Sequence, residues 1–101
     1  MTFGTITVEI DGEVQSIVPE FLENRKKDCT LIEDFLEQNS FNEIRTLGHR
    51  MKGAGGSYGF DDISEIGELI EVAAIAGDKE TISTAVLRLT EYLERVTVVY
   101  V

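Results

Sequence analysis

The one histidine of this 101-residue chain, His49, lies in a segment whose residue types suit phosphoryl chemistry. The nitrogen of a neutral imidazole is a nucleophile near pH 7. Residues 44–60 contain no Asp or Glu, yet they hold Arg45, Arg50 and Lys52, in a chain with a formal net charge of −10. Local positive charge around a nucleophile attracts a phosphoryl group, whose oxygens an ammonium such as that of Lys52 can neutralise.

The segment around His49 has the pattern of an amphipathic helix, and His49 lies on its outward face. Apolar residues recur at three- and four-residue steps from Ile44 to Tyr58, which is typical of a helix with one buried face. At 100° per residue, His49 lies about 200° from Met51 in that apolar stripe. Its neighbours on the outward face, four residues before and three, four and seven after it, are Arg45, Lys52, Gly53 and Gly56.

Glycines are frequent in this helix. Each glycine inside a helix costs about 1 kcal/mol relative to alanine, so several of them need a reason. For the outward Gly53 and Gly56 we favour a surface kept free of side chains, so that the backbone of a partner can approach His49. Close packing between helices is the alternative and suits Gly48 and Gly55. Gly59 is placed to end the helix.

The rest of the chain supplies elements that would position this helix. Apolar spacing predicts helices over 19–38, from Ser40 to Gly59, from Asp62 to Gly77, and from Asp78 onward. Ser40 with Glu43, and Asp62 with Glu65, have the spacing of capping boxes, and Asp78 is placed to cap the fourth helix. Short connections make sequential helices antiparallel neighbours. The predicted fold is therefore all-α, an antiparallel up-down four-helix bundle.

The two ends of the chain are rich in β-branched residues. Residues 5–10 alternate and predict a strand. Residues 96–101 either continue the last helix or lie beside 5–10, and the sequence leaves both open. We expect one domain over the whole chain, residues 1–101. It has a short extended or helical N-terminal segment at 1–12, followed by the helical bundle at 13–98.

The second and third predicted helices also bring two carboxylates to the histidine. If these helices form a hairpin that turns near Phe60, residues whose numbers add to about 120 lie level with each other. His49 is then level with Glu71, and Lys52 with Glu68. A carboxylate that accepts the Nδ1 proton of His49 would fix the tautomer and leave Nε2 free to attack. A solvated helix face is the alternative for both glutamates.

Composition narrows the function further. Nine Lys and Arg against nineteen Asp and Glu argue against a nucleic-acid binder and against docking on an anionic membrane. One Cys and one His argue against a structural zinc site, so no metal site is expected. The sequence has neither a P-loop nor a dinucleotide fingerprint, and no apolar run reaches the length of a membrane span. We expect a cytoplasmic protein.

Residues 49–60 resemble the signature of histidine phosphotransfer (HPt) domains. That signature is a His, a Lys at plus three, a Gly at plus four and a Gly at plus ten, and all four match at His49, Lys52, Gly53 and Gly59. The resemblance covers about residues 8–95 and includes Leu47, residues 17–22 and Glu-Leu-Ile-Glu at 68–71. Gly48 departs from the family, which usually has a larger residue there, and this predicts a looser helix just before the histidine.

The resemblance implies a phosphorelay function. His49 would accept a phosphoryl group on Nε2 from the phospho-aspartate of a response-regulator receiver domain and pass it to another receiver. Lys52 would screen the phosphoryl charge, and Gly53 would leave room for the receiver. Glu71 stands where family members carry a Gln or Glu that bonds Nδ1. Such domains have no kinase or phosphatase activity and need no cofactor of their own, because Mg²⁺ belongs to the receiver.

The implied partners are receiver domains and a hybrid sensor histidine kinase. We expect them to dock on the outward face of the second and third helices and on part of the first, around Arg45, Arg50, Gly53, Gly56 and Glu68. Two alternatives stay open. One is a helical adaptor that binds receivers or kinases without accepting phosphate, and the other is a small oligomeric structural bundle.

Overall fold

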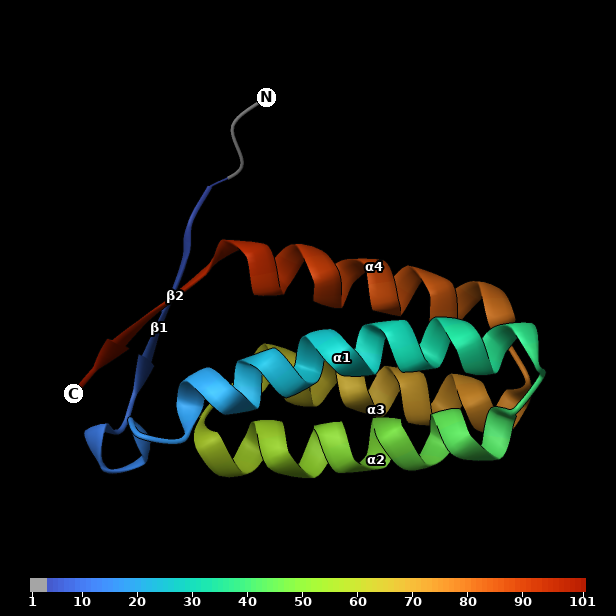
Figure 1. Ribbon diagram of the computed structural model, residues 1–101, viewed down its shortest axis with the longest axis horizontal. Helices are drawn as coiled ribbons and strands as arrows, with labels where there is room; N and C mark the ends of the chain where they lie inside the picture. Colours follow the sequence, from blue (N-terminus) through green and yellow to red (C-terminus); the bar gives the residue numbers. More distant parts are fainter. Residues whose placement is uncertain (1–3) are drawn as a thin grey trace.

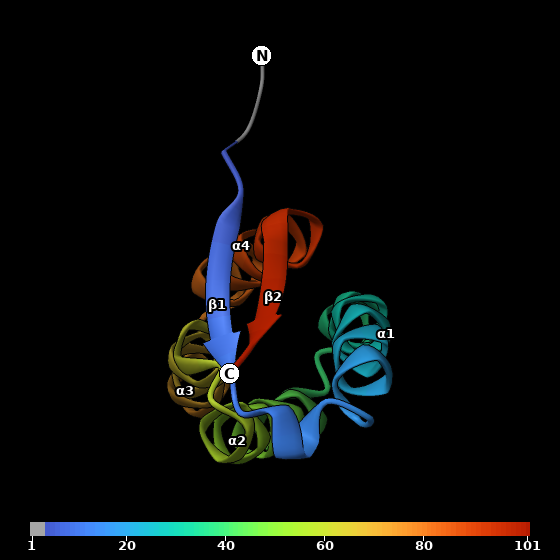
Figure 2. The same ribbon diagram turned by 90° about the vertical axis from the view of Figure 1, so that its left-hand side faces the viewer.

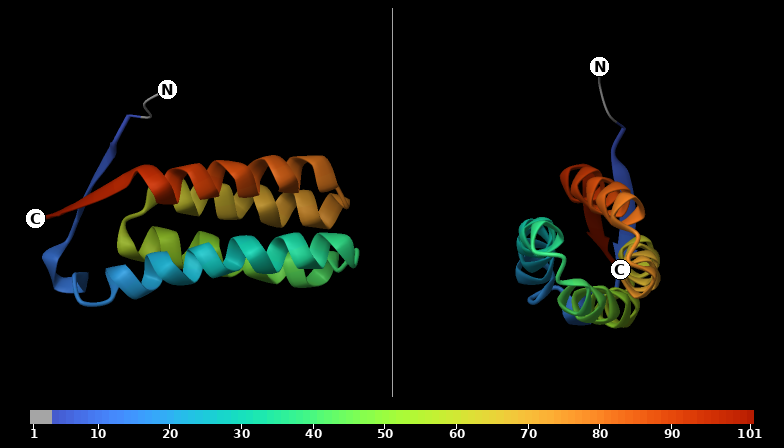
Figure 3. Two further views of the ribbon diagram at one scale, coloured as in Figure 1. Left: turned by 45° about the horizontal axis from the view of Figure 1, so that its top comes forward. Right: turned by 90° about the vertical axis from the view of Figure 1, so that its right-hand side faces the viewer.

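Four helices, two short strands and one 3₁₀ turn form the structure, a computed structural model that describes residues 4–101 (Figure 1). The elements in chain order are β1 (Ile6–Ile10), η1 (Gly12–Val14), α1 (Val18–Glu37), α2 (Phe41–Tyr58), α3 (Asp61–Ala76), α4 (Lys79–Arg95) and β2 (Val96–Tyr100). The four helices lie side by side as a bundle (Figures 1 and 3). The structure thus confirms the four helices of the predicted bundle.

Two glycines end helices and make tight turns. Gly59 has a φ of 88° and Gly77 a φ of 66°, in the left-handed region that glycine adopts without a steric penalty. Gly59 is therefore the turn residue that the sequence predicted. The turns after α1 and after α3 lie at one end of the bundle, and the turn after α2 lies at the other (Figure 1).

The start of α2 differs from its predicted capping box. Ser40 precedes the helix, but its side chain makes no capping hydrogen bond. Its backbone N–H instead closes α1 by donating to the carbonyl of Phe35 at 2.9 Å. The cap of α4 is as predicted, because a carboxylate oxygen of Asp78 accepts from the N–H of Thr81 at 3.1 Å.

The start of α3 also differs from the prediction. The helix begins at Asp61, so Phe60 occupies the N-terminal capping position that was predicted for Asp62. The N–H of Phe60 donates to the carbonyl of Gly55 at 2.8 Å, so this residue completes the turn after α2. Because one residue closes α2 and opens α3, no room is left for the predicted capping box further along.

Apolar side chains from all four helices fill the middle of the bundle. Together with Ile10 of β1 and Phe60 between α2 and α3, the largest fully buried side chains are Ile32, Ile44, Met51, Ile63, Ile66, Ile70, Ile82, Leu89 and Val18. Aromatic contacts fix α1 against the turn between α2 and α3. The ring of Phe21 stacks on Phe60 with centroids 5.3 Å apart and meets Tyr58 edge-on at 5.1 Å. The core therefore anchors α1, although α1 stands further out than the other helices in the end-on view (Figure 2).

The two ends of the chain pair as a parallel two-stranded sheet at one end of the bundle (Figure 2). The register runs from Ile6↔Val96 to Ile10↔Tyr100. The ladder continues past both strands, since the N–H of Val101 donates to Ile10 at 2.9 Å. Alternating β-branched residues place one face of each strand toward the helices and the other toward solvent.

This sheet corrects two predictions. It departs from the all-α class, and α4 ends at Arg95, before the predicted bundle limit of residue 98. The C-terminal residues lie beside the N-terminal strand, which was one of the two alternatives left open. Residues 1–3 of the predicted N-terminal segment at 1–12 lie outside the described residues. No helix within residues 4–101 is long and apolar enough to cross a membrane.

Candidate functional site

The imidazole of His49 lies on the surface of α2, beside α3. Its side chain is 73% exposed, and its Nδ1 is 2.9 Å from Oε2 of Glu71, whose side chain is 18% exposed. An ionised carboxylate only accepts hydrogen bonds, so with Glu71 ionised the Nδ1–H group of His49 donates a hydrogen bond to Oε2. In a neutral ring that tautomer leaves the lone pair on Nε2. The two residues lie level with each other, as the hairpin arithmetic predicted.

A second pair joins α2 and α3 close by. The Nζ of Lys52 lies 3.5 Å from Oε1 of Glu68, and the two side chains are 43% and 59% exposed. An exposed ion pair of this kind contributes little stability, so the ammonium can move to a phosphoryl oxygen at small cost. Lys52 follows His49 by three residues and shares its side of α2. The structure thus brings together four of the predicted site residues in two pairs across α2 and α3.

The two arginines of the predicted interface lie on different sides of α2. Both are exposed. Arg45 precedes His49 by one helical turn and shares its face. Arg50 is turned by 100° from His49. Its positive charge acts to lower the pKa of Asp28 on α1. The predicted cationic patch therefore spreads from the α2–α3 side toward α1.

The surface next to His49 is open at two glycines. A Cβ at Gly53 would meet no heavy atom within 4 Å, and a Cβ at Gly56 would meet only the Oγ of Ser64, at 3.6 Å. Packing within the chain therefore does not require glycine at either position. A bare surface beside the histidine is the property that the sequence predicted for Gly53 and Gly56.

Three other glycines let α2 and α3 touch backbone to backbone. A Cβ at Gly48 would lie 2.7 Å from the backbone nitrogen of Glu71, and a Cβ at Gly67 would lie 2.5 Å from that of Lys52. Gly55 is equally close to α3. The predicted loosening of the helix at Gly48 is wrong, because α2 is continuous there and the missing side chain admits α3. Gly67 was missed, although a glycine inside the buried stripe of a helix is a signal of close packing.

A buried carboxylate on α1 was also missed. Asp28 is 8% exposed, and the Nε of Arg25 donates to its Oδ2 at 2.8 Å. Burial raises the pKa of Asp28, although the charges of Arg25 and Arg50 oppose that rise. The guanidinium of Arg25 also lies 4.8 Å from the ring centroid of Phe21. Contacts with Asp28 and Phe21 therefore hold the Arg25 side chain against its own helix, α1.

A shallow groove between α1 and α2 extends the surface on the Arg50 side. Its volume is about 280 Å³, and its lining includes Ile17, Phe21, Ala54 and Tyr58. Ile17 is 40% exposed, so its side chain is accessible from solvent there. The groove offers apolar contact area close to the cationic patch, as expected for part of the first helix.

The fold is a bundle of four helices, and the exposed imidazole of His49 lies on α2 beside a carboxylate of α3. Residues 16–97 match the family model of the Hpt domain, which is nearly the whole chain, and the chain belongs to that family. Hpt domains are phosphocarrier modules of phosphorelay signalling that interact with receiver domains, and they are neither kinases nor phosphatases. No curated protein and no solved structure matches the chain.

Proposed function

We propose that this protein carries a phosphoryl group on Nε2 of His49 between receiver-domain aspartates of a two-component phosphorelay. The observation that carries the proposal is the pair of His49 and Glu71. A carboxylate 2.9 Å from Nδ1 orients the ring and keeps the proton on that nitrogen, while solvent reaches the rest of the side chain. A nucleophile needs this combination of orientation and access.

The transfer step uses few groups of this chain. The Nε2 lone pair attacks phosphorus, the bond between phosphorus and the aspartyl oxygen of the donor breaks, and the aspartate leaves as a carboxylate. The ring gains positive charge, which Glu71 stabilises through Nδ1. Lys52 turns from Glu68 to the phosphoryl oxygens, since that ion pair is exposed and weak. Mg²⁺ is supplied by the receiver, and this chain contributes no cofactor.

The docking face that we propose combines charged side chains with backbone that glycines leave accessible. It contains Arg45, Arg50, Gly53, Gly56 and Glu68, together with the groove beside α1. The open space at Gly53 lets a receiver place its own backbone against α2. Receiver domains and a hybrid sensor histidine kinase are the partners that suit this face, and the antiparallel up-down order of the helices keeps α2 and α3 side by side beneath it. We place this exchange in the cytoplasm.

Chemical phosphorylation tests the acceptor. Wild type and His49→Gln are treated with phosphoramidate and compared by intact mass. We expect one acid-labile phosphate on the wild type and none on the variant, with unchanged circular dichroism. A folded wild type that takes up no phosphate would refute the acceptor role. Receiver binding that survives in His49→Gln, without phosphate on the wild type, would favour the adaptor.

A second variant tests the docking face separately from the acceptor. Gly53→Leu adds a large side chain at an open position, where a Cβ would meet no heavy atom of a neighbouring element within 4 Å, so the bundle is expected to stay folded. Phosphoramidate should still label His49 in this variant, because the small reagent needs no docking surface. Transfer from a phosphorylated receiver should be lost. Undiminished transfer from the receiver would remove Gly53 from the interface.

A further inference from the structure

A groove between α1 and α4 lies on the side of the bundle away from His49. The helices are arranged in the order α1, α2, α3, α4 around the bundle, so the α2–α3 seam with His49 is opposite the gap between α4 and α1 (Figure 2). Two adjoining cavities occupy this gap, with volumes of about 390 and 380 Å³. Both are lined by Glu33 and Thr90, so they form one continuous groove.

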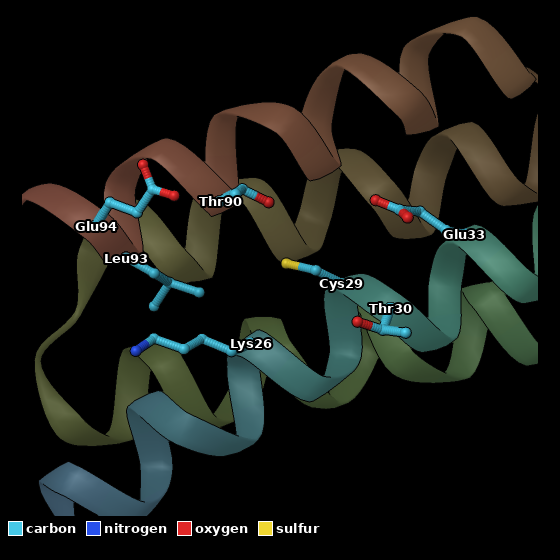
Figure 4. A pocket seen from close by; sticks show the side chains of 7 residues that line it. All are labelled: Lys26, Cys29, Thr30, Glu33, Thr90, Leu93 and Glu94. Atoms are coloured by element: carbon cyan, nitrogen blue, oxygen red, sulfur yellow. The ribbon is translucent and has the colours of Figure 1, made fainter.

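Apolar side chains form part of the floor of the groove, and the length of the groove suits a helix. Cys29 and Leu93 lie in the first cavity, where their side chains converge from α1 and α4 (Figure 4). Val86 and Leu87 lie in the second, and Leu87 is 61% exposed. The lining extends over eleven residues of α1 and twelve of α4, which is about 15 Å or three helical turns.

The rim of the groove is acidic. Glu33 and Glu94 line it directly. Glu37 follows Glu33 by one turn on α1, and Glu91 precedes Glu94 by three residues on α4, so each adds a second carboxylate near the same rim. The one cation in the lining, Lys26, lies 3.6 Å from Glu23 and is largely offset by it. Negative charge on both sides of an apolar floor is complementary to a helix with cationic flanks.

We propose that this groove binds a cationic amphipathic helix of a partner protein. Such a helix would place apolar side chains, spaced at three- and four-residue steps, against Leu87, Val86 and Leu93. Its Lys or Arg residues on either flank would meet the carboxylates of α1 and α4. Two packed helices with a gap between them accept a further helix by the same ridge-and-groove packing that holds a bundle together. The partner could stay bound while a receiver occupies the opposite side.

A designed peptide tests this proposal. The probe is a synthetic, labelled helix of about 16 residues with Leu on one face and Lys on the other, and its control carries Glu in place of Lys. Fluorescence anisotropy gives the affinities, and ¹⁵N–¹H spectra locate the site. We expect saturable binding of the Lys peptide with amide shifts in α1 and α4, and binding of the Glu peptide at least about tenfold weaker.

A matched pair of variants separates the groove from the general acidity of the chain. Leu87→Lys puts a cation into the groove and should weaken binding of the Lys peptide by about tenfold or more. Val72→Lys makes the same change of charge on α3, at a residue that is 58% exposed, and should weaken it by less than about threefold. His49→Gln should bind the peptide like the wild type, so this test is independent of phosphoryl transfer.

Several outcomes would overturn the proposal. Equal weakening by Leu87→Lys and Val72→Lys would show that only net charge attracts the peptide. Shifts centred on α2 and α3 would place the peptide on the receiver side. Absence of saturable binding, or self-association of the protein through Leu87 with no peptide bound, would show that a cationic helix is not the occupant.

Discussion

Substitution of two glycines in α2 by alanine should change the stability of the domain in opposite directions. A Cβ at Gly48 would lie 2.7 Å from the backbone nitrogen of Glu71 and 2.9 Å from the carbonyl oxygen of Gly67. An ordinary contact is about 3.4 Å or more, so α2 and α3 would have to separate by about 0.7 Å at this point. Both contacts are backbone atoms, and no rotamer change can relieve them.

The magnitude follows from two opposing terms. Overpacking of this kind costs about 1–3 kcal/mol, and we take the upper end because backbone must move. Replacing a helical glycine by alanine raises the free energy of unfolding by about 1 kcal/mol. Gly48→Ala should therefore lower the free energy of unfolding by about 2 kcal/mol. Gly53→Ala, where a Cβ meets nothing within 4 Å, should raise it by about 1 kcal/mol.

Urea denaturation followed by circular dichroism at the helix band measures both values. With an m-value of about 1 kcal/mol/M, the midpoints of the two variants should differ by about 3 M. Unchanged m-values would show that the comparison concerns native stability. If Gly48→Ala proved as stabilising as Gly53→Ala, the close contact between α2 and α3 would not exist and the helices would have to lie further apart.

Three further results are expected. Lys52→Ala should slow phosphoryl transfer to His49 by about tenfold without changing the urea midpoint, because the Lys52–Glu68 pair is exposed; an unchanged rate would remove Lys52 from the mechanism. Glu71→Ala should slow phosphorylation by about tenfold or more, and ¹⁵N spectra of the ring should show loss of the Nδ1–H tautomer; an unchanged tautomer would return Glu71 to a solvated helix face. Burial and the charges of Asp62 and Asp61 raise the pKa of Tyr92 to about 12 from its usual 10. The unfolded chain releases this proton first, so between these values wild type should lose stability with rising pH more steeply than Tyr92→Phe, and equal slopes would contradict that shift.

Much of the candidate site could be predicted from local spacing. The outward direction of His49 follows from the helical period, and the level placement of Glu71 follows from a two-helix hairpin with a short turn. Both depend on residues near each other in the sequence or joined by a tight connection. For the same reason Gly59 was recognisable as the residue that ends α2 and begins the turn to α3.

The features that sequence analysis missed depend on contacts between elements. Close packing was an alternative for Gly48, but the glycine that meets it, Gly67, is identified only when the backbones of α2 and α3 are placed together. The capping box at Ser40 failed because its backbone completes α1. The pairing of β1 with β2 joins opposite ends of the chain, and alternating β-branched residues do not name their partner strand.

The parallel pairing of β1 and β2 determines how the domain responds to mechanical tension. When the chain is stretched from both sides, β1 is pulled toward its first residue and β2 toward its last, in opposite directions along one axis (Figure 2). The ladder hydrogen bonds are then loaded in shear and share the force, so they must rupture together. Two antiparallel strands pulled apart from one end would open bond by bond. Force applied through proteins attached to each end of this domain would therefore load the β1–β2 pair first. The helix that carries His49 would bear no tension until the hydrogen bonds between β1 and β2 had broken.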